Sequence, residues 1–241
     1  MSIAFTMLDE GSSLPPGYKY VEDRIIFNVK VGFTRKARWV AVDHKTPDLI
    51  RPTYTGVISR ESVRISFTYE TLNDLEVFVV NIQNAHLKAP CSEKYYIICG
   101  KEWGPNLFGK KVKDAGALYG LKSSGANFKN HLRDCMDHLG FQSCLGDDDI
   151  WYKSVVKSNG DGYWEYILLY TDDCLVISEF GEDILQKDLN PYFRLKEESI
   201  VHQTIYLGGK VSNVVLPNDV ISWDFSANQY VQKLWQKLNS T

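Results

Sequence analysis

The sequence lacks the features that send a chain into a membrane or out of the cell. It has no uninterrupted apolar run of about eighteen residues, so we expect no transmembrane helix. Its first residues, MSIAFTMLDEGSS, have neither the basic start nor the apolar centre of a secretory signal. We therefore expect an intracellular protein, cytoplasmic or nuclear, with no membrane partner.

Cysteine and net charge are also scarce. The five cysteines are an odd set without a CxxC pair, which favours free thiols in a reducing compartment over disulfides or a zinc site. The formal net charge is −3, so no global basic field attracts nucleic acid or an anionic membrane. A local basic groove is still compatible with this total.

What is present is an ordinary globular composition. The chain has 241 residues, 44% of them hydrophobic and 24% charged, which is enough for a sizeable core. Apolar strand patterns interleave with helical patterns without a regular strand–helix–strand alternation. This order predicts an α+β fold built on an antiparallel sheet.

Local patterns place several elements. Residues 1–16 are polar and end in Pro15-Pro16, so we expect a flexible arm over 1–18. Ser59 is a suitable N-cap for a helix over 60–73, and apolar residues at helical spacing predict another helix from Ser124 to Gly140. A strand pair around Pro217-Asn218-Asp219 and a final helix are predicted within 211–241.

The stretch EYILLYTDDCLVIS, residues 165–178, places two adjacent carboxylates between apolar strand patterns. One interpretation is a tight turn, where aspartate is common. The other is a Mg²⁺ site, because carboxylates are the hard oxygen ligands that Mg²⁺ prefers. A two-metal site needs a further carboxylate from a neighbouring strand, and the strand pattern LEVFVVNI (75–82) offers Asn81 instead.

Four segments in order carry a family resemblance. VNIQNAHL (80–87), ALYGLKSSGANF (117–128), LLYTDDCLVIS (168–178) and YLGG (206–209) resemble the reverse transcriptase of copia-type retrotransposons. LYGLKSSG followed by YTDD is the most specific combination, and RKARWVA and SRESVRI are similar to the family's upstream segments. The resemblance runs from about residue 20 to the last helix.

The resemblance implies a right-hand polymerase fold with fingers and palm, an antiparallel palm sheet packed on helices, and a partial thumb at the C-terminus. In that arrangement an arm (1–18) precedes fingers-like strands (19–60), a palm with an interleaved fingers segment (61–210), and a C-terminal hairpin and helix (211–241). The implied activity is RNA-directed DNA polymerase. Such a nucleotidyltransferase extends a primer on an RNA or DNA template from dNTPs, with Mg²⁺ or Mn²⁺.

The resemblance also implies roles for individual residues. Asp172 and Asp173 match the metal-binding carboxylates, and Asn81 falls where the family carries its third metal-binding aspartate. His86 falls where the family has an aromatic residue that packs against the incoming sugar and excludes ribonucleotides. The remaining implied contacts are nucleotide binding by Lys36, Arg38 and Lys122, and template or primer binding by Gly120, Ser123, Tyr206 and Gly208.

Structural explanations compete with these roles. Lys36 and Arg38 fit a solvated strand face as well as a triphosphate grip. Gly120 fits a turn, and His86 fits a buried polar side chain with a local partner.

The chain departs from the family at the implied metal site. Asn81 is neutral, so one negative charge leaves a site that holds two dications. Phosphoryl transfer depends on positioning and electrostatics, so we expect a rate loss of orders of magnitude. Asp147-Asp148-Asp149 adds negative charge where relatives usually carry a proline.

Three hypotheses follow. The first is a reverse transcriptase domain from a retrotransposon polyprotein, impaired by Asn81. The second is a catalytically inactive nucleic-acid-binding module or a decayed element fragment. The third, an unrelated phosphotransferase or metal hydrolase, leaves LYGLKSSG unexplained. The sequence sets neither the oligomeric state nor the template preference.

Overall fold

The protein is described by a computed structural model in which the chain forms two compact units. Unit 1 comprises Met1–Thr55 and Asn84–Asp134, and unit 2 comprises Gly56–Gln83 and Cys135–Thr241. The boundaries expected for fingers and palm stay predictions. The described residues are 5–8, 13–29, 33, 35–42, 56–91, 93–114, 116–196, 201–202, 205–206, 209–227, 231–232 and 235.

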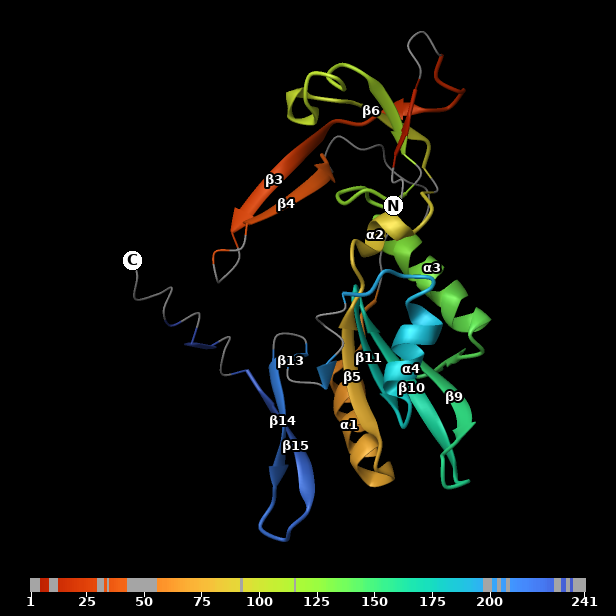
Figure 1. The fold of residues 1–241 in the computed structure, drawn as a ribbon, viewed down its shortest axis with the longest axis vertical. Helices are drawn as coiled ribbons and strands as arrows, with labels where there is room; N and C mark the ends of the chain where they lie inside the picture. The colour runs from red at the N-terminus through yellow and green to blue at the C-terminus, as the bar shows by residue number, and fades with distance from the viewer. Residues whose placement is uncertain are drawn as a thin grey trace. The chain divides into compact units, whose positions relative to one another are not determined.

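Unit 2 is built on an antiparallel six-stranded sheet of order β12-β5-β11-β10-β9-β8 (Figure 1). The register of its centre sets Tyr170 opposite Asp173, and Asp173 opposite Asn81. The strands are β5 (Glu76–Asn81), β8 (Gln142–Ser143), β9 (Ile150–Val156), β10 (Gly162–Tyr170), β11 (Asp173–Ser178) and β12 (Val201–His202).

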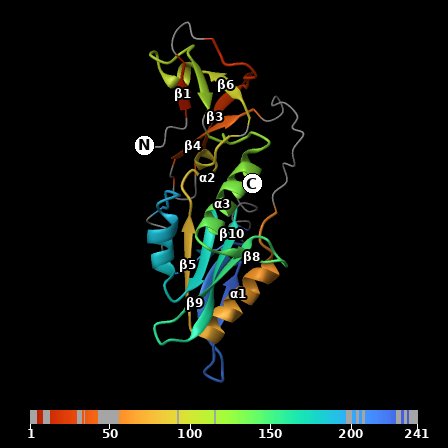
Figure 2. The same ribbon diagram turned by 90° about the vertical axis from the view of Figure 1, so that its right-hand side faces the viewer.

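Helices cover both faces of this sheet (Figure 2). Helix α1 (Arg60–Asn73) lies on one face, and α4 (Gly181–Asp183) with the π-helical segment η3 (Ile184–Leu189) lies on the other. Because both faces are covered, the whole run Cys174–Ile177 of β11 is buried. The helix predicted over 60–73 is confirmed, and the Ser59 hydroxyl caps it by accepting from Ser62 N at 3.0 Å.

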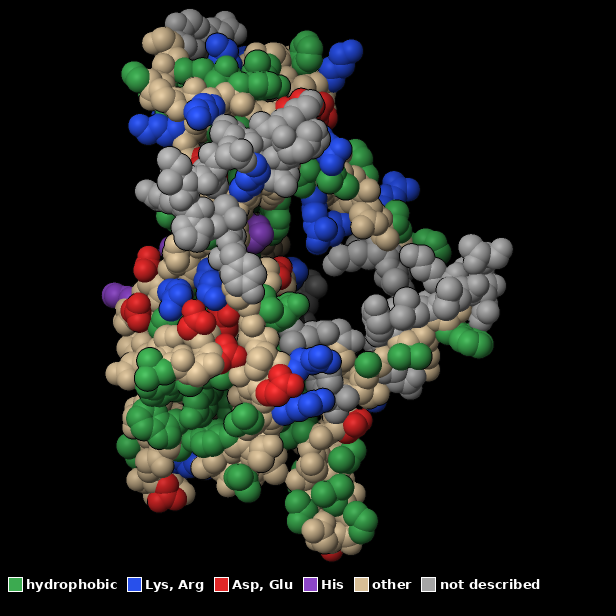
Figure 3. All heavy atoms as spheres, turned by 180° about the vertical axis from the view of Figure 1, so that it is seen from behind, with side chains coloured by type: hydrophobic (Ala, Val, Ile, Leu, Met, Phe, Trp, Pro, Cys, Tyr) green, Lys and Arg blue, Asp and Glu red, His purple; other side chains and the backbone are tan. Residues whose placement is uncertain are grey.

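A second sheet of unit 2 packs beside α1. It consists of β13 (Ile205–Tyr206), β14 (Gly209–Val215) and β15 (Ile221–Ser226). The Trp223 ring lies 5.0 Å from the ring of Phe67, and its indole N–H donates to Glu70. The strand pair predicted around Pro217 is confirmed, whereas the predicted final helix falls mostly outside the described residues. The far end of the β14–β15 hairpin exposes the apolar side chains of Val215, Leu216, Val220 and Ile221 (Figure 3).

Unit 1 has a smaller sheet, a hairpin and short helical turns. The sheet order is β1-β7-β6-β2, and the hairpin pairs β3 with β4. Its core is an apolar cluster that includes Val21, Ile97, Val112 and Leu118. The elements are β1 (Phe5–Met7), β2 (Lys19–Tyr20), β3 (Asp23–Val29), β4 (Arg35–Ala41), α2 (Ala85–Lys88), β6 (Tyr95–Ile98), η2 (Lys101–Trp103) and β7 (Lys111–Asp114). Helix α3 (Ser124–His138) spans the division between the units.

The expectation of a flexible arm over 1–18 is wrong for Phe5–Met7. These residues form β1, which pairs with β7. The Phe5 ring packs edge-on against Trp39 at 4.3 Å and Trp103 at 6.0 Å. The contacts of one half-buried aromatic ring offset the conformational entropy that is lost when a short strand is ordered. The polar residues around Phe5 in the sequence conceal this contact. Among the described residues, no helix is both long and apolar enough to cross a membrane.

Candidate functional site

The adjacent aspartates lie at a two-residue turn of the central hairpin in unit 2. Tyr170 pairs with Asp173, so Thr171 and Asp172 form the turn between β10 and β11. Thr171 has φ +54°, in the left-handed region that a β-branched residue rarely adopts. Backbone strain of this kind concentrates at functional positions. The turn interpretation and the site interpretation are therefore compatible here.

We expect Thr171→Asn to stabilise the protein by about 1 kcal/mol, because asparagine tolerates the left-handed conformation and threonine does not. The free energy of unfolding in urea measures this. Thr171→Ala is the matched control, since it removes the branch but keeps the Cβ that causes the strain. A loss of stability in Thr171→Asn would show that the threonine side chain makes a contact worth more than the strain.

The end of β5 is hydrogen-bonded to this turn. Asn81 Nδ2 donates to Asp173 Oδ1 at 2.7 Å, and Ile82 N donates to the Asp172 carbonyl at 2.7 Å. Asp172 and Asp173 are both half-buried. Burial raises the pKa of Asp173, and the Asn81 bond opposes this rise. The structure thus brings Asn81, Asp172 and Asp173 together at one end of the sheet.

Lys196 is a further member of this group, and the sequence did not indicate it. Lys196 N donates to the Asn81 carbonyl at 3.1 Å, and Gln83 N donates to the Arg194 carbonyl at 2.8 Å. The Lys196 ammonium also donates to Asn81 Oδ1, and its charge opposes the rise in the pKa of Asp173. Asn81 and Lys196 are 115 positions apart, so no local pattern could have linked them.

The donor set determines which metal the site can hold. Two adjacent carboxylates are hard oxygen ligands and fit a Mg²⁺ or Mn²⁺ ion. The Asn81 amide differs, because its N–H points at Asp173 and its oxygen receives the Lys196 ammonium. The residues therefore fit a divalent cation at Asp172 and Asp173, and Asn81 acts here as a positioning group for Asp173.

Tyr206 lies in the core of unit 2 rather than at a surface. Its side chain is 1% exposed and packs in the apolar cluster with Leu168 and Leu175. Its hydroxyl has no hydrogen-bond partner among the described residues, and burial raises its pKa. A side chain buried to this degree does not reach a primer in this structure. Gly208, also expected at the primer, lies outside the described residues.

In unit 1, the structure gives Gly120 and Ser123 structural explanations. Gly120 has φ +88°, and a Cβ built there would lie 2.2 Å from the Ala41 carbonyl oxygen. The neighbouring Tyr119 carbonyl accepts from Ala41 N at 2.7 Å, which holds the loop against β4. The Ser123 hydroxyl is buried and donates to the Glu93 carboxylate.

The other expected nucleotide contacts also belong to unit 1. The half-buried ring of His86 faces Tyr119 at 4.5 Å and Phe128 at 5.8 Å. The register of β3 and β4 puts Lys36 and Arg38 on the same face of their hairpin. Arg38 is exposed, and Lys36 and Lys122 are half-buried.

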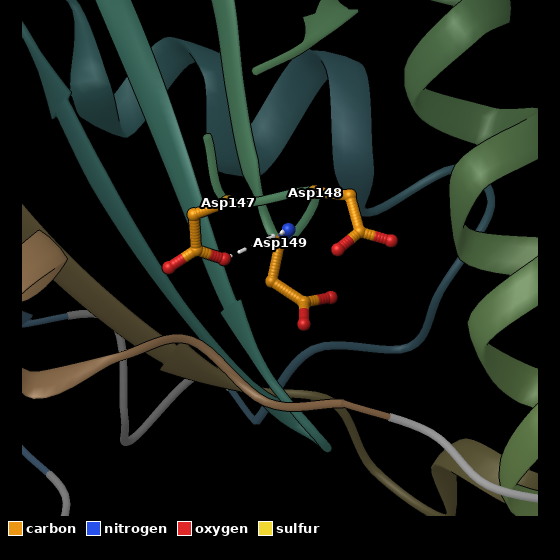
Figure 4. A group of neighbouring side chains, drawn as sticks. All are labelled: Asp147, Asp148 and Asp149. Atoms are coloured by element: carbon orange, nitrogen blue, oxygen red, sulfur yellow. Dashed lines mark hydrogen bonds between the residues drawn. The ribbon is translucent and has the colours of Figure 1, made fainter. Parts of the chain in front are cut away.

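Asp147, Asp148 and Asp149 form a separate acidic group in unit 2, with carboxylate oxygens within 4.8 Å of one another (Figure 4). Asp147 accepts from Ser59 N at 3.1 Å, from the Ser62 hydroxyl at 2.6 Å and from Asp149 N at 3.2 Å. Asp147 therefore anchors the N-terminus of α1, where negative charge is favourable. These bonds account for Asp147 without a metal ion.

Asp147 gives a pH-dependent prediction. Burial alone would raise the pKa of its carboxyl, but the bonds from Ser62, Ser59 and Asp149 lower it below the ordinary value of 3.8. Its contribution to stability is therefore complete above that value and is lost as the pH falls through the folded-state pKa. We expect Asp147→Asn to cost about 1–2 kcal/mol in urea unfolding at pH 7. The difference from the natural chain should shrink at pH 3, and an equal difference at both pH values would contradict this assignment.

Comparison with known proteins finds similar transposon polyproteins. No protein-family model matches the chain. The chain is similar to the Gag-Pol polyproteins of transposons Ty1-ER2 and Ty1-MR2 from Saccharomyces cerevisiae, each 27% identical over 175 residues. The match covers 71% of this chain and 9% of each polyprotein. This similarity supports an origin in the polyprotein of a copia-type retrotransposon.

Proposed function

We propose that the chain is the fingers and palm part of a retrotransposon reverse transcriptase, and that its polymerase activity is weakened by Asn81. The observation that carries the proposal is the register of unit 2, in which Asn81 lies directly opposite Asp173 and beside the turn that holds Asp172. A polymerase palm needs polar ligands from a hairpin turn and from a neighbouring strand end. The similarity to Gag-Pol polyproteins supports the same proposal.

The chemistry assigned to this site is template-directed addition of a deoxynucleotide to a primer. Divalent cations at such a site neutralise the charge that develops on the phosphoryl oxygens. In this chain Asp172 and Asp173 would hold the cation, and the Asn81 amide would orient Asp173. The half-buried setting strengthens each of these electrostatic contacts relative to bulk water.

The proposed partners are a template with its primer and dNTPs. Lys36, Arg38 and Lys122 would contact the triphosphate, and His86 would lie against the incoming sugar. Gly120 and Ser123 would shape the loop that faces template and nucleotide. The right-hand polymerase fold and a primer contact at Gly208 belong to this proposal, whereas Tyr206 is assigned to the core that supports them.

Primer extension on an RNA template with dNTPs and Mg²⁺ tests the proposal. We expect the Asn81→Asp protein to synthesise DNA and the Asn81→Asp/Asp172→Asn protein to lose that synthesis. The double variant has the net charge of the natural chain, so Asn213→Asp, which adds one negative charge on β14 away from the strand end, is the control for a general charge effect. If a folded Asn81→Asp protein makes no DNA, the chain is not a polymerase disabled at this position.

A further inference from the structure

We propose that Lys196 is a built-in counter-ion of the strand-end site, so that the site binds one divalent cation rather than two. The ammonium would take the place of the second cation beside Asn81 and Asp173. The inference deepens the proposed function and rests on it for the expected pair of metals. The geometry that supports it belongs wholly to unit 2.

The position of Lys196 is fixed by backbone pairing. Residues 194–196 run antiparallel to residues 81–83, with Ile82 bridged to Leu195. The bond from Lys196 N to the Asn81 carbonyl places the lysine next to the end of β5. Its side chain then needs only to return to the Asn81 amide, to which its ammonium donates. A lysine on a freely moving loop would lose more conformational entropy to reach the same place.

The orientation of the Asn81 amide suits a neighbouring lysine and does not suit a metal ion. Its N–H group faces Asp173, and its oxygen faces the ammonium. A cation bridging residues 81 and 173 would need an oxygen where this N–H lies. The amide would have to turn, and both hydrogen bonds would be lost. The hydrogen bond from the Asn81 amide to Asp173 thus links the ends of β5 and β11. With an aspartate at position 81, a metal ion bound between the two carboxylates would make this link.

The summed charge of the strand-end group also favours one bound divalent cation. Asp172 and Asp173 contribute two negative charges, Lys196 contributes one positive charge, and Asn81 contributes none. One divalent cation leaves this group with a single positive charge. Two divalent cations would leave the group with three positive charges. In contrast, a site with three carboxylates and no lysine has a single positive charge when it binds two divalent cations. Like charges this close repel even in water, so the second cation is disfavoured.

Titration of the protein with Mn²⁺ in the absence of nucleotide tests the inference. The electron paramagnetic resonance signal of free Mn²⁺ gives the number of bound ions and their affinity. We expect the natural chain to bind one Mn²⁺, and Asp172→Asn to lose it. Lys196→Met should bind the first ion roughly tenfold more tightly. Asn81→Asp/Lys196→Met, which has three carboxylates and no lysine, should bind two ions. Lys187→Met is the matched control, because Lys187 is exposed and, among the described residues, its ammonium pairs with Asp183. It should bind as the natural chain does.

The inference is overturned if the natural chain already binds two ions, or if folded Lys196→Met binds Mn²⁺ as the natural chain does. Lys196→Gln removes the charge but keeps a donor, and it replaces Lys196→Met if that variant does not fold. Primer extension separates the two proposals. If Asn81→Asp synthesises DNA while neither Lys196 variant changes Mn²⁺ binding, only this inference fails. If Asn81→Asp gains neither Mn²⁺ binding nor synthesis, the proposed function fails as well.

Discussion

Asn81→Asp is expected to raise the rate of primer extension about 10²- to 10³-fold over the natural chain at saturating Mg²⁺, the range lost when one charge-stabilising group leaves an active site. The substitution replaces the amide opposite Asp173 by a third carboxylate at the same sheet end. That carboxylate adds a ligand and a negative charge where cations must gather. The ratio of single-turnover rates on one RNA template measures the effect.

The control for this prediction is Asn213→Asp. Asn213 is exposed on β14 of the same unit, so its substitution changes the net charge equally without touching the strand-end group. It should leave the rate unchanged. A natural chain as fast as its Asn81→Asp variant would show that the amide suffices for catalysis.

Gly120→Ala should destabilise the protein by about 3 kcal/mol or more. Two penalties combine at this position: the left-handed backbone at φ +88° and the clash of the new Cβ with a backbone oxygen of Ala41, which has no flexible end to move. The clash would also separate the 117–123 loop from β4. Urea unfolding of the full chain, monitored by tryptophan fluorescence, gives the change in free energy.

Gly109→Ala separates these two penalties. Gly109 has φ +80° in the same unit, but no atom lies within 4 Å of its added Cβ. We expect it to cost only about 1 kcal/mol, from the backbone conformation alone. If both alanine substitutions lower the free energy of unfolding equally, the proximity of the Ala41 carbonyl is not what requires glycine at position 120. A stable Gly120→Ala protein that failed only in template binding would instead favour a functional reason for this glycine.

Elements set by local patterns could be predicted from the sequence. The Ser59 cap, the apolar run of β11 and the polar end of β5 at Asn81 all follow from neighbouring residues, and the structure has each of them. The proximity of Asn81 to the aspartate pair was expected from the family resemblance. The residues alone left turn and metal site open, and the structure shows that a strained turn carries the carboxylates.

Contacts between distant segments could not be predicted in this way. Lys196 reaches Asn81 through the pairing of 194–196 with 81–83, and no periodicity in either segment indicates this contact. The strand around Phe5 depends on two tryptophans far along the chain. Glu93 binds Ser123, a residue that the resemblance had assigned to nucleic acid alone.

The pairing of β5 with β11 also affects how the protein folds. Asn81 and Asp173 are 92 positions apart, so the loop between them must close before their strands can pair. Closure over such a separation is entropically expensive, and topologies dominated by distant contacts fold slowly. During synthesis, the edge of β5 that pairs with β11 therefore stays unpaired until β11 has emerged from the ribosome. The candidate site comes into being only late in folding, and no fragment that stops before Asp173 can assemble it.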